Sequence, residues 1–387
     1  MKECVQITFL GDLMCQMQQI RAVKKAACGY AAVFDKVKHI WSDSDFVVAN
    51  LETPVAGKGF RLAFEEMRFN APVEFLSAVK GSGVNFVTTA NNHILDRGAR
   101  GLDSTLVQIA NVGLETTGAY ANREESNEVF VKCIKGVKVA FVACTYDTNS
   151  GRKADMLEEN ELWKVDYVHH PTPFLGDWRF AIKRTIKGIV PYRFKQWLKS
   201  RNGIKWAAPQ PDSFPASDFE DSKHKSFLLN ICDKVKRTKT IADIVVALPH
   251  IGGQYNSEPG TWQLMVTDAL IEAGADLVVS NHAHTPLRIE KRTGALVAHA
   301  LGNFCFTPRV GFYNDKCQAD YSIVLHCSID AEMKKLCGWK YEIIKTVTRE
   351  DGVSIVVPVT DIDNADIEAI AQRVGHLPAV NQEVGIS

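Results

Sequence analysis

The sequence predicts an α/β fold, and three observations point to that class. Short runs rich in β-branched and aromatic residues alternate with stretches of helical composition, a rhythm typical of strands that alternate with helices. Five of the apolar runs end abruptly in polar residues, as a buried strand does where it leaves its sheet. The alternation stops between Asp147 and Lys239 and resumes afterwards, which indicates a long insertion.

The segment before the insertion supplies three of these five strands. Helix boundaries are taken from a proline near a helix start and a glycine after a helix end. The expected elements are strands at 5–10, 46–49 and 86–89, helices at 18–38 (broken at Gly29), 72–80 and 102–111, and a hairpin of 128–134 with 137–144.

The segment after the insertion restores the alternation. It is expected to hold strands at 244–248 and 277–279, a helix at 261–273, a hairpin of 287–290 with 295–301, strands at 321–329, 339–347 and 353–358, and a helix at 363–374. We therefore expect a core of residues 1–146 and 240–330, an insertion of residues 147–239, and residues 331–387 completing the core.

The expected insertion contains a basic amphipathic stretch, Trp178 to Trp206, in which arginine and lysine alternate with aromatic and aliphatic residues. Two interpretations stay open. In the first, its apolar side packs over a site as a lid or surface arm. We prefer this interpretation because long insertions in enzymes are often functional. Alternatively, it makes peripheral contact with an anionic membrane surface.

Composition excludes several classes of protein. The 387 residues are 46% hydrophobic and 23% charged, as in an ordinary globular protein. The 45 basic and 45 acidic residues cancel, so we expect no nucleic-acid partner. The N-terminal apolar run contains Gln6 and Thr8 and reads as a strand, not a signal peptide. Ten cysteines without a Cys-x-x-Cys pair argue against a zinc ribbon and favour reduced thiols in the cytoplasm.

The polar strand ends carry the candidate chemistry. The most informative stretch is Val84 to Asp96, where a strand runs into Asn92 and His93. In open α/β sheets the carboxyl ends of the strands converge on one crevice, so distant tips could meet there. The other tips supply Asp12, Glu52, His250, His282 and His284. Such a mixed oxygen and nitrogen set suits one or two divalent ions of Mn, Zn or Fe.

The motifs occur in a fixed order along the chain. They are Gly11-Asp12-Leu13-Met14, Ala49-Asn50-Leu51-Glu52-Thr53-Pro54, Ala90-Asn91-Asn92-His93 with Asp96 and Gly98, Pro249-His250-Ile251-Gly252-Gly253-Gln254-Tyr255, His282-Ala283-His284 and Leu301-Gly302-Asn303-Phe304. In this order they resemble the CapA family, the poly-gamma-glutamate capsule-synthesis type of protein in the calcineurin-like metallophosphoesterase superfamily. The resemblance implies a four-layer α/β/β/α sandwich of two mixed sheets, with a two-metal site at the strand ends.

The resemblance also implies roles for individual residues. Metal ligands would be Asp12, Glu52, Asn92, His250, His282 and His284. The catalytic candidates are His93, which would protonate a leaving group or steady an oxyanion, and Asp96. The substrate-binding candidates are Asn50, Asn91, Tyr255 and Asn303.

The chain also departs from the superfamily pattern. Met14 stands where a histidine ligand is common, Glu52 replaces the usual bridging aspartate, and Gln254 stands where CapA-like proteins commonly have glutamate.

Simpler structural roles are open for several of these residues. Asp12 could cap the next helix, Asn92 could be a turn residue, and the two histidines of the His-Ala-His motif could be merely structural. Asn50 and Asn303 could satisfy loop backbone groups. Asp96 could either orient His93 or cap the helix that begins near Gly98.

Three functions follow from the resemblance. The first is a metal-dependent hydrolase in which an ion-activated water attacks a phosphoester, or less favourably an amide, of a small or polymeric anionic substrate, such as one in poly-gamma-glutamate metabolism. The second is a non-catalytic component of capsule synthesis or export. The third is a binding module with a degenerate metal site, which Met14 and Gln254 suggest.

Overall fold

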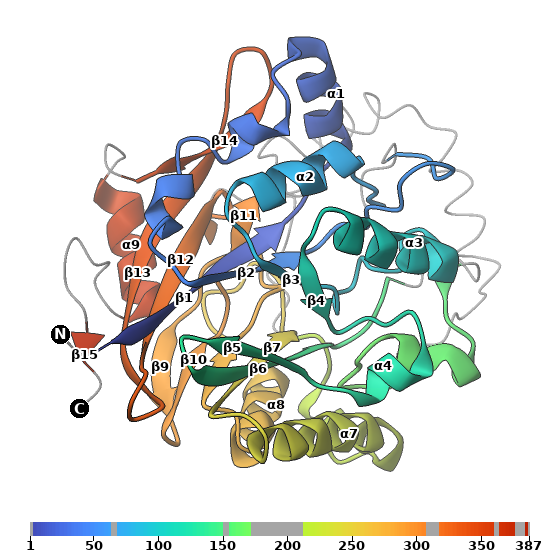
Figure 1. Cartoon of the computed structure of the whole chain (residues 1–387), viewed down its shortest axis with the longest axis vertical. Coiled ribbons are helices and arrows are strands. Elements are labelled where there is room, and N and C mark those ends of the chain that lie inside the picture. The colour runs from blue at the N-terminus through green and yellow to red at the C-terminus, as the bar shows by residue number, and fades with distance from the viewer. Residues whose placement is uncertain are drawn as a thin grey trace, which may run out of the picture.

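The computed structural model describes residues 3–62, 68–149, 155–171, 212–306, 317–359, 364–375 and 384–385. Two mixed β-sheets lie face to face, and helices cover both outer faces (Figure 1). The predicted four-layer α/β/β/α arrangement is therefore confirmed.

Within the described residues, the first sheet has nine strands. Its central order is β14-β13-β12-β1-β2-β3-β4, while β11 pairs with β1 and β15 with β13. Strands β1 to β4 run parallel to one another, and β12 turns the direction by pairing antiparallel with β1. The bounds are β1 Cys4–Leu13, β2 Phe46–Leu51, β3 Phe86–Thr88, β4 Glu115–Thr117, β11 Asn303–Cys305, β12 Tyr321–Asp330, β13 Lys335–Thr348, β14 Ser354–Pro358 and β15 Val384–Gly385.

In the part of the chain that the structure describes, the second sheet has six strands in the order β5-β6-β7-β8-β10-β9. Its four central strands are parallel, and the hairpin partners β5 and β9 form antiparallel edges. The bounds are β5 Phe130–Ile134, β6 Val137–Thr145, β7 Ile244–His250, β8 Leu277–Val279, β9 Ile289–Arg292 and β10 Ala295–Ala298.

The alternation of side chains along each strand builds three apolar layers. In β2, Phe46 and Val48 face the layer between the two sheets, whereas Val47 and Ala49 face the helices outside. In β7, Val246 faces the layer between the sheets. Both faces of the central strands are buried, which explains their nearly continuous apolar sequence.

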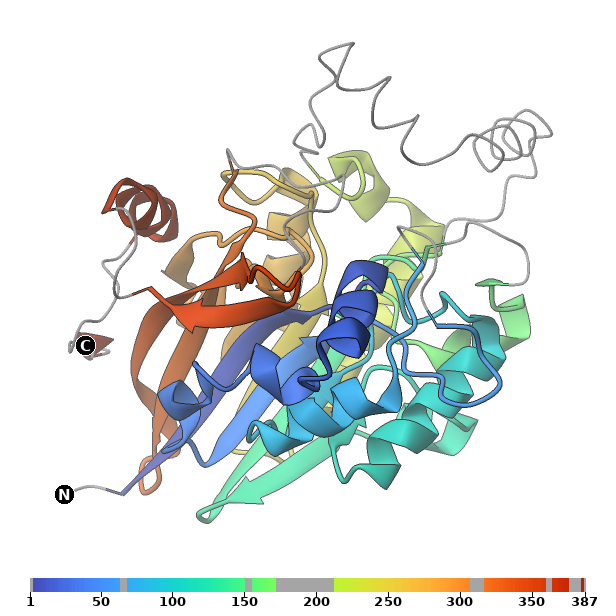
Figure 2. The ribbon, with the colours of Figure 1, turned by 90° about the horizontal axis from the view of Figure 1, so that it is seen from above.

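The helices complete the sandwich. Helices α1, α2 and α3 lie over the first sheet, and α7 and α8 over the second (Figure 1). Figure 2 shows α9 and the C-terminal strands at one end of the molecule and α3 toward the other. The bounds are α1 Met17–Ala26, η1 Tyr30–Val33, η2 Lys38–Trp41, α2 Val73–Gly81, α3 Gly98–Asn111, α4 Arg123–Asn127, η4 Glu159–Lys164, η5 Ala216–Phe219, α7 Ser222–Lys239, α8 Thr261–Glu272 and α9 Asn364–Val374.

The expected insertion, residues 147–239, includes part of this scaffold. Its last segment is α7, whose Leu228, Ile231 and Val235 are buried against the second sheet and α8. Helix α7 therefore belongs to the packed core and not to an insertion that ends at residue 239. The sequence did not reveal this because α7 is rich in lysine and begins with polar residues, so its overall composition hides the apolar face. The basic stretch from Trp178 to Trp206 lies outside the described residues.

Other differences concern short elements. Strand β11 was expected to be loop, because three residues are too few to show a period of two. The helix expected over 18–38 ends at Ala26, since Ala27 takes a left-handed conformation (φ 51°). None of the helices in the described ranges is long and apolar enough to span a membrane.

Candidate metal centre

The candidate site lies where the carboxyl ends of strands from both sheets meet. Asp12 lies within β1, Glu52 directly follows β2, and Asn92 and His93 lie in the loop after β3. From the second sheet, His250 ends β7, and His282 and His284 lie in the loop after β8. All of these side chains are buried, with at most 4% of each residue exposed. The structure therefore brings together the six predicted ligands and the predicted catalytic histidine.

One group of potential ligands contains Glu52, His250 and His282. Nε2 of His250 lies 3.4 Å from Oε1 of Glu52 and 3.1 Å from Nδ1 of His282. The amide oxygen of Asn92 is 2.9 Å from the same Nε2. Two atoms that are each ~2.1 Å from a tetrahedral ion lie about 3.4 Å apart. The spacing of this group therefore suits one metal ion.

A second group contains Asp12, Glu52 and His284, with one potential ligand atom from each within 4.8 Å of the others. Nδ1 of His284 is 3.8 Å from Asp12 Oδ2 and 3.9 Å from Glu52 Oε2. The two groups share Glu52, which contributes Oε1 to the first and Oε2 to the second contact set. A carboxylate in this position can bridge two ions.

The surroundings of Glu52 test whether a cation fits the site. Glu52 is 0% exposed, and neither of its carboxylate oxygens has a hydrogen-bond partner within the described residues. A buried carboxylate without a partner is costly unless a cation compensates it. Burial and then the charge of Glu52 raise the pKa of Asp12 well above its usual range, and burial likewise raises the pKa of Glu52. The donor set therefore suits a divalent metal, which would reverse both effects.

Three residues at the site have left-handed backbone conformations. The φ angles are 97° at His282, 57° at His284 and 59° at Tyr255. Each such conformation costs of the order of 1–3 kcal/mol in a residue other than glycine. With these conformations, the loop places the His282 imidazole near Glu52 and the His284 imidazole near both Glu52 and Asp12.

His93 is held from one side by a carboxylate. Its Nδ1 lies 2.9 Å from Oδ2 of Asp96, and Asp96 in turn accepts a hydrogen bond from the backbone N–H of Phe69 at 2.6 Å. Burial lowers the pKa of His93, but the charge of Asp96 and the hydrogen bond to it more than offset this, and the net shift is upward. Helix α3 begins at Gly98 without a side-chain cap. The structure thus gives Asp96 the orienting position and not the capping one.

The three predicted substrate-binding asparagines are tied into the scaffold. Asn50 donates to Asp12 Oδ1 at 2.7 Å and accepts from Thr88. Asn91 donates to the carbonyl of Leu51 and accepts from the N–H of His93.

Asn303 donates to the carbonyls of His284 and Ala319, and its oxygen accepts from Nδ1 of His284 at 2.8 Å. In this tautomer Nδ1 carries the proton, so Nε2 is the ring nitrogen of His284 that can bind an ion. Partners of this kind fix the orientation of metal ligands. The fourth candidate, Tyr255, packs its ring 5.5 Å from that of His284.

The other two departures noted in the sequence, Met14 and Gln254, also lie at the site. Met14 is buried with Phe69 and Phe306, and these rings contact His93 and His284 respectively. The side chain that replaces a nitrogen ligand therefore belongs to an apolar wall. Nε2 of Gln254 lies 3.5 Å from Nε2 of His284.

Two residues that contact the candidate site, Asn149 and Tyr146, were not recognised from the sequence. The amide nitrogen of Asn149 lies 3.1 Å from Nδ1 and 3.4 Å from Nε2 of His93. The ring of Tyr146 packs 4.6 Å from that of His282. Both residues follow β6, so they too occupy a strand end. Neither is a histidine or a carboxylate, and Asn149 lies within the insertion expected from the sequence.

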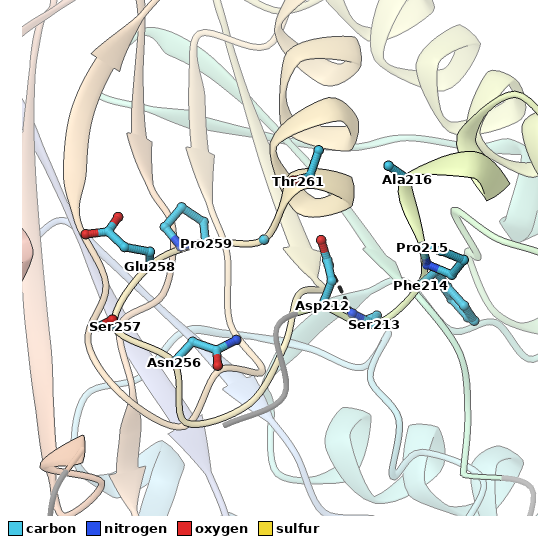
Figure 3. Close-up of a pocket in the computed structure, with 11 residues that line it drawn as sticks. Asp212, Ser213, Phe214, Pro215, Ala216, Asn256, Ser257, Glu258, Pro259 and Thr261 are labelled. Carbon is cyan, nitrogen blue, oxygen red and sulfur yellow. Dashed lines mark hydrogen bonds between the residues drawn. The ribbon is translucent and has the colours of Figure 1, made fainter. Parts of the chain in front are cut away.

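A cleft of about 700 Å³ lies elsewhere, at the start of α8 (Figure 3). Oδ2 of Asp212 accepts hydrogen bonds from the N–H groups of Trp262 and Gln263. The helix start is therefore already capped by a carboxylate, and Glu258 adds a second acidic group to the lining. This cleft is a poor receptor for an anion.

Comparison with known families agrees with the strand-end motifs. The family model described as "Bacterial capsule synthesis protein PGA_cap" matches residues 6–308, which is most of the chain. The chain belongs to the PGA_cap family. The resemblance to CapA expected from the sequence is thereby confirmed.

Two curated relatives of this PGA_cap protein carry the name CapA. It is 24% identical over 383 residues to "PGA biosynthesis protein CapA" of Bacillus subtilis (strain 168), covering 94% of this chain and 84% of the relative. It is 25% identical over 308 residues to "Capsule biosynthesis protein CapA" of Bacillus anthracis, covering 79% of this chain and 60% of the relative.

Among solved structures, one described as a novel phosphatase from Mycoplasma pneumoniae aligns over 95% of this chain and 99% of its own length. The TM-score is 0.41 at 12% identity, values too low to support an argument about function.

Proposed function

We propose that this PGA_cap protein is a metal-dependent hydrolase that acts on a phosphoester. The observation that carries the proposal is the position of Glu52, a buried carboxylate without hydrogen-bond partners in the described structure, shared by two groups of potential ligands. A pair of divalent ions bound there would lower the pKa of water and withdraw charge from a phosphoryl oxygen. This chemistry requires no serine or cysteine nucleophile, because the attacking group would be a metal-bound water.

The residues of the site would have separate roles in metal binding and proton transfer. Glu52, Asp12, His284, His250, His282 and Asn92 would hold the ions. Nε2 of His93 is directed away from Asp96, so His93 can donate a proton to the departing oxygen while Asp96 stabilises the imidazolium form. Asp96 is thus a positioning residue. Asn149, beside Nε2 of His93, can hydrogen-bond a substrate oxygen at the same place.

The substrate we propose is anionic, either small or polymeric. Support comes from the names of the Bacillus relatives, which associate those proteins with PGA or capsule biosynthesis. Amide hydrolysis ranks second, because a two-ion site suits displacement at phosphorus most directly. A divalent ion of Mn, Zn or Fe matches the imidazole and carboxylate donors.

A non-catalytic role in capsule synthesis or export, or as a binding module, remains the second candidate. Two observations favour it: Met14 places a thioether in an apolar wall where a nitrogen ligand is common, and Gln254 has no carboxylate to act as a base. Either substitution could leave one ion weakly held. The number of bound ions and the turnover together distinguish the two functions.

The test measures metal content and hydrolysis of p-nitrophenyl phosphate and bis(p-nitrophenyl) phosphate. Glu52→Gln keeps the side-chain volume but removes the charge, so both ions should be lost together with activity. His284→Ala should release one ion and His282→Ala the other. Glu124→Gln, on an exposed part of α4, serves as the matched control and should retain both. Wild-type protein that binds two ions yet hydrolyses no phosphoester would overturn the proposal in favour of the binding module.

A further inference from the structure

A second cluster of potential ligands lies outside the candidate metal centre. It consists of His169, Asp218 and His224, which offer one atom each within 4.8 Å of one another. His169 lies shortly before the described chain stops at residue 171. Asp218 lies in η5, and His224 lies in the first turn of α7. The cluster therefore joins two segments that are distant in sequence.

The hydrogen bond at Nδ1 determines the tautomer of His169. Nδ1 lies 2.8 Å from the carbonyl oxygen of His170, which can only accept, so Nδ1 carries the proton. Nε2 of the neutral ring then presents an electron pair. It faces Oδ2 of Asp218 at 3.4 Å, which is also an acceptor. Two acceptors this close need a positive charge between them.

The surroundings make this juxtaposition significant. His169 is only 3% exposed, and its Nε2 has no hydrogen-bond partner in the described part of the chain. Nδ1 of His224 is also buried and lacks a hydrogen-bond partner within the same residues.

The spacing of the ligand atoms of His169 and Asp218 suits a small transition-metal ion, whereas the ring of His224 does not face it in the present arrangement. The distance of 3.4 Å between Nε2 and Oδ2 is that expected for two ligands on a tetrahedral ion with bonds of ~2.1 Å. A bound histidine that donates its other ring N–H to a backbone carbonyl is the usual arrangement around zinc. The rings of His169 and His224 are stacked at 3.6 Å and 11°, so His224 must rotate to direct Nδ1 at the same ion.

We propose that His169, Asp218 and His224 form a structural site for a zinc-type divalent cation, separate from the candidate metal centre. Two imidazoles and a carboxylate are a donor set that Zn²⁺ accepts, with water as the fourth ligand. The ion would link the segment containing His169, which follows the Thr145–Tyr167 bridge, to the segment that begins α7.

The site supports an aromatic wall of the metal centre. The other face of the His169 ring stacks on Phe214 at 3.5 Å. Phe214 packs edge-on against Tyr146 at 5.9 Å, and Tyr146 packs against His282 at 4.6 Å. Fixing His169 therefore fixes Phe214, the first member of a contact series that ends on a proposed metal ligand.

The experiment uses full-length protein carrying Glu52→Gln and His282→Ala, so that the candidate centre binds no metal. Zinc is added, the excess is removed, and the bound metal is measured by mass spectrometry. About one equivalent should remain. Adding Asp218→Asn or His224→Gln should weaken zinc binding by about tenfold or more, since even outer-shell changes cost 10- to 100-fold.

His170→Gln is the matched control. The Nδ1 of His170 also donates to a backbone carbonyl, that of Pro171, but its Nε2 faces the exposed Glu159 and lies outside the cluster. This variant should keep its equivalent of zinc. Cobalt provides a second measurement that does not depend on the variants, because Co²⁺ bound by the double variant should show the absorption of a tetrahedral site.

Two results would overturn the proposal. One is a folded double variant, checked by circular dichroism, that binds no zinc at micromolar concentration. The other is zinc binding that is unchanged by Asp218→Asn and His224→Gln. Neither result bears on the phosphoesterase proposal, which depends on Glu52 and its partners.

Discussion

Replacing His93 by alanine separates proton transfer from metal binding. His93 is adjacent to the proposed ligand Asn92, yet its Nδ1 is engaged by Asp96 at 2.9 Å and neither ligand group includes it. His93→Ala should therefore leave the metal content unchanged and slow the reaction. His282→Ala should lose metal and activity together.

The size of the effect follows from the contact to Asp96. A positioned proton donor contributes ~10²–10⁴-fold, or about 2.7–5.4 kcal/mol of barrier at 1.36 kcal/mol per tenfold. Asp96→Asn keeps an oxygen for Phe69 and His93 but removes the charge that stabilises the imidazolium. A hydrogen bond to a charged group is worth ~1.5–3 kcal/mol, so this variant should slow turnover by roughly 10- to 150-fold. The order of rates is therefore wild type, Asp96→Asn, His93→Ala.

The assay is kcat for p-nitrophenyl phosphate with metal content measured on the same samples. Thermal unfolding of each variant checks that the fold is intact. Unchanged kcat in His93→Ala would remove this histidine from the mechanism. Loss of metal in His93→Ala would show that it is a ligand, and a slower Asp96→Asn than His93→Ala would contradict the assignment of Asp96 as a positioning residue.

Two further substitutions test the scaffold. Lys234→Met should lower the free energy of unfolding by about 3–5 kcal/mol. The reason is that the buried carboxylate of Asp166, which lies 2.8 Å from Nζ of Lys234, loses its cation. The control Lys236→Met breaks an exposed ion pair on the same helix and should cost less than about 1 kcal/mol. Equal shifts in denaturant midpoint for the two lysine variants would contradict this reasoning. Gly11→Ala should prevent stable folding or metal binding, since a Cβ there would overlap the carbonyl oxygen of Gly302. The control Gly81→Ala has open space around its Cβ and should leave the melting temperature nearly unchanged. A Gly11→Ala protein with normal stability and metal content would refute the steric argument.

Much of the fold could be predicted from the sequence, because its strands are strongly marked. Buried strands such as β2 and β7 are apolar on both faces and end in polar residues, so both their type and their carboxyl ends are visible. Strand β11 and helix α7 were not recognised, the first because of its length and the second because lysines dominate its composition. Their positions depend on tertiary packing and leave a weak local signal.

The candidate site was likewise predictable only in part. Asp12, Glu52, His250, His282 and His284 could be predicted because motif order links residues that are distant in sequence. The sequence could not predict that Asn50, Asn91 and Asn303 hydrogen-bond within the scaffold. An asparagine at a strand end looks the same in a sequence whether its amide faces a substrate or a neighbouring side chain. Asn149 and Tyr146 could be found only from the convergence of β6 with the other strand ends.

The least favourable features of the structure coincide at the candidate metal centre. Glu52 buries a carboxylate without a hydrogen-bond partner among the described residues, and His282 and His284 hold strained backbone conformations. In a purely structural core such features would only destabilise the fold. A divalent cation would offset the first by neutralising Glu52 and Asp12. It would also give the second a function, because the loop places the His282 imidazole near Glu52 and the His284 imidazole near Glu52 and Asp12. The unfavourable elements are therefore those that a metal site requires.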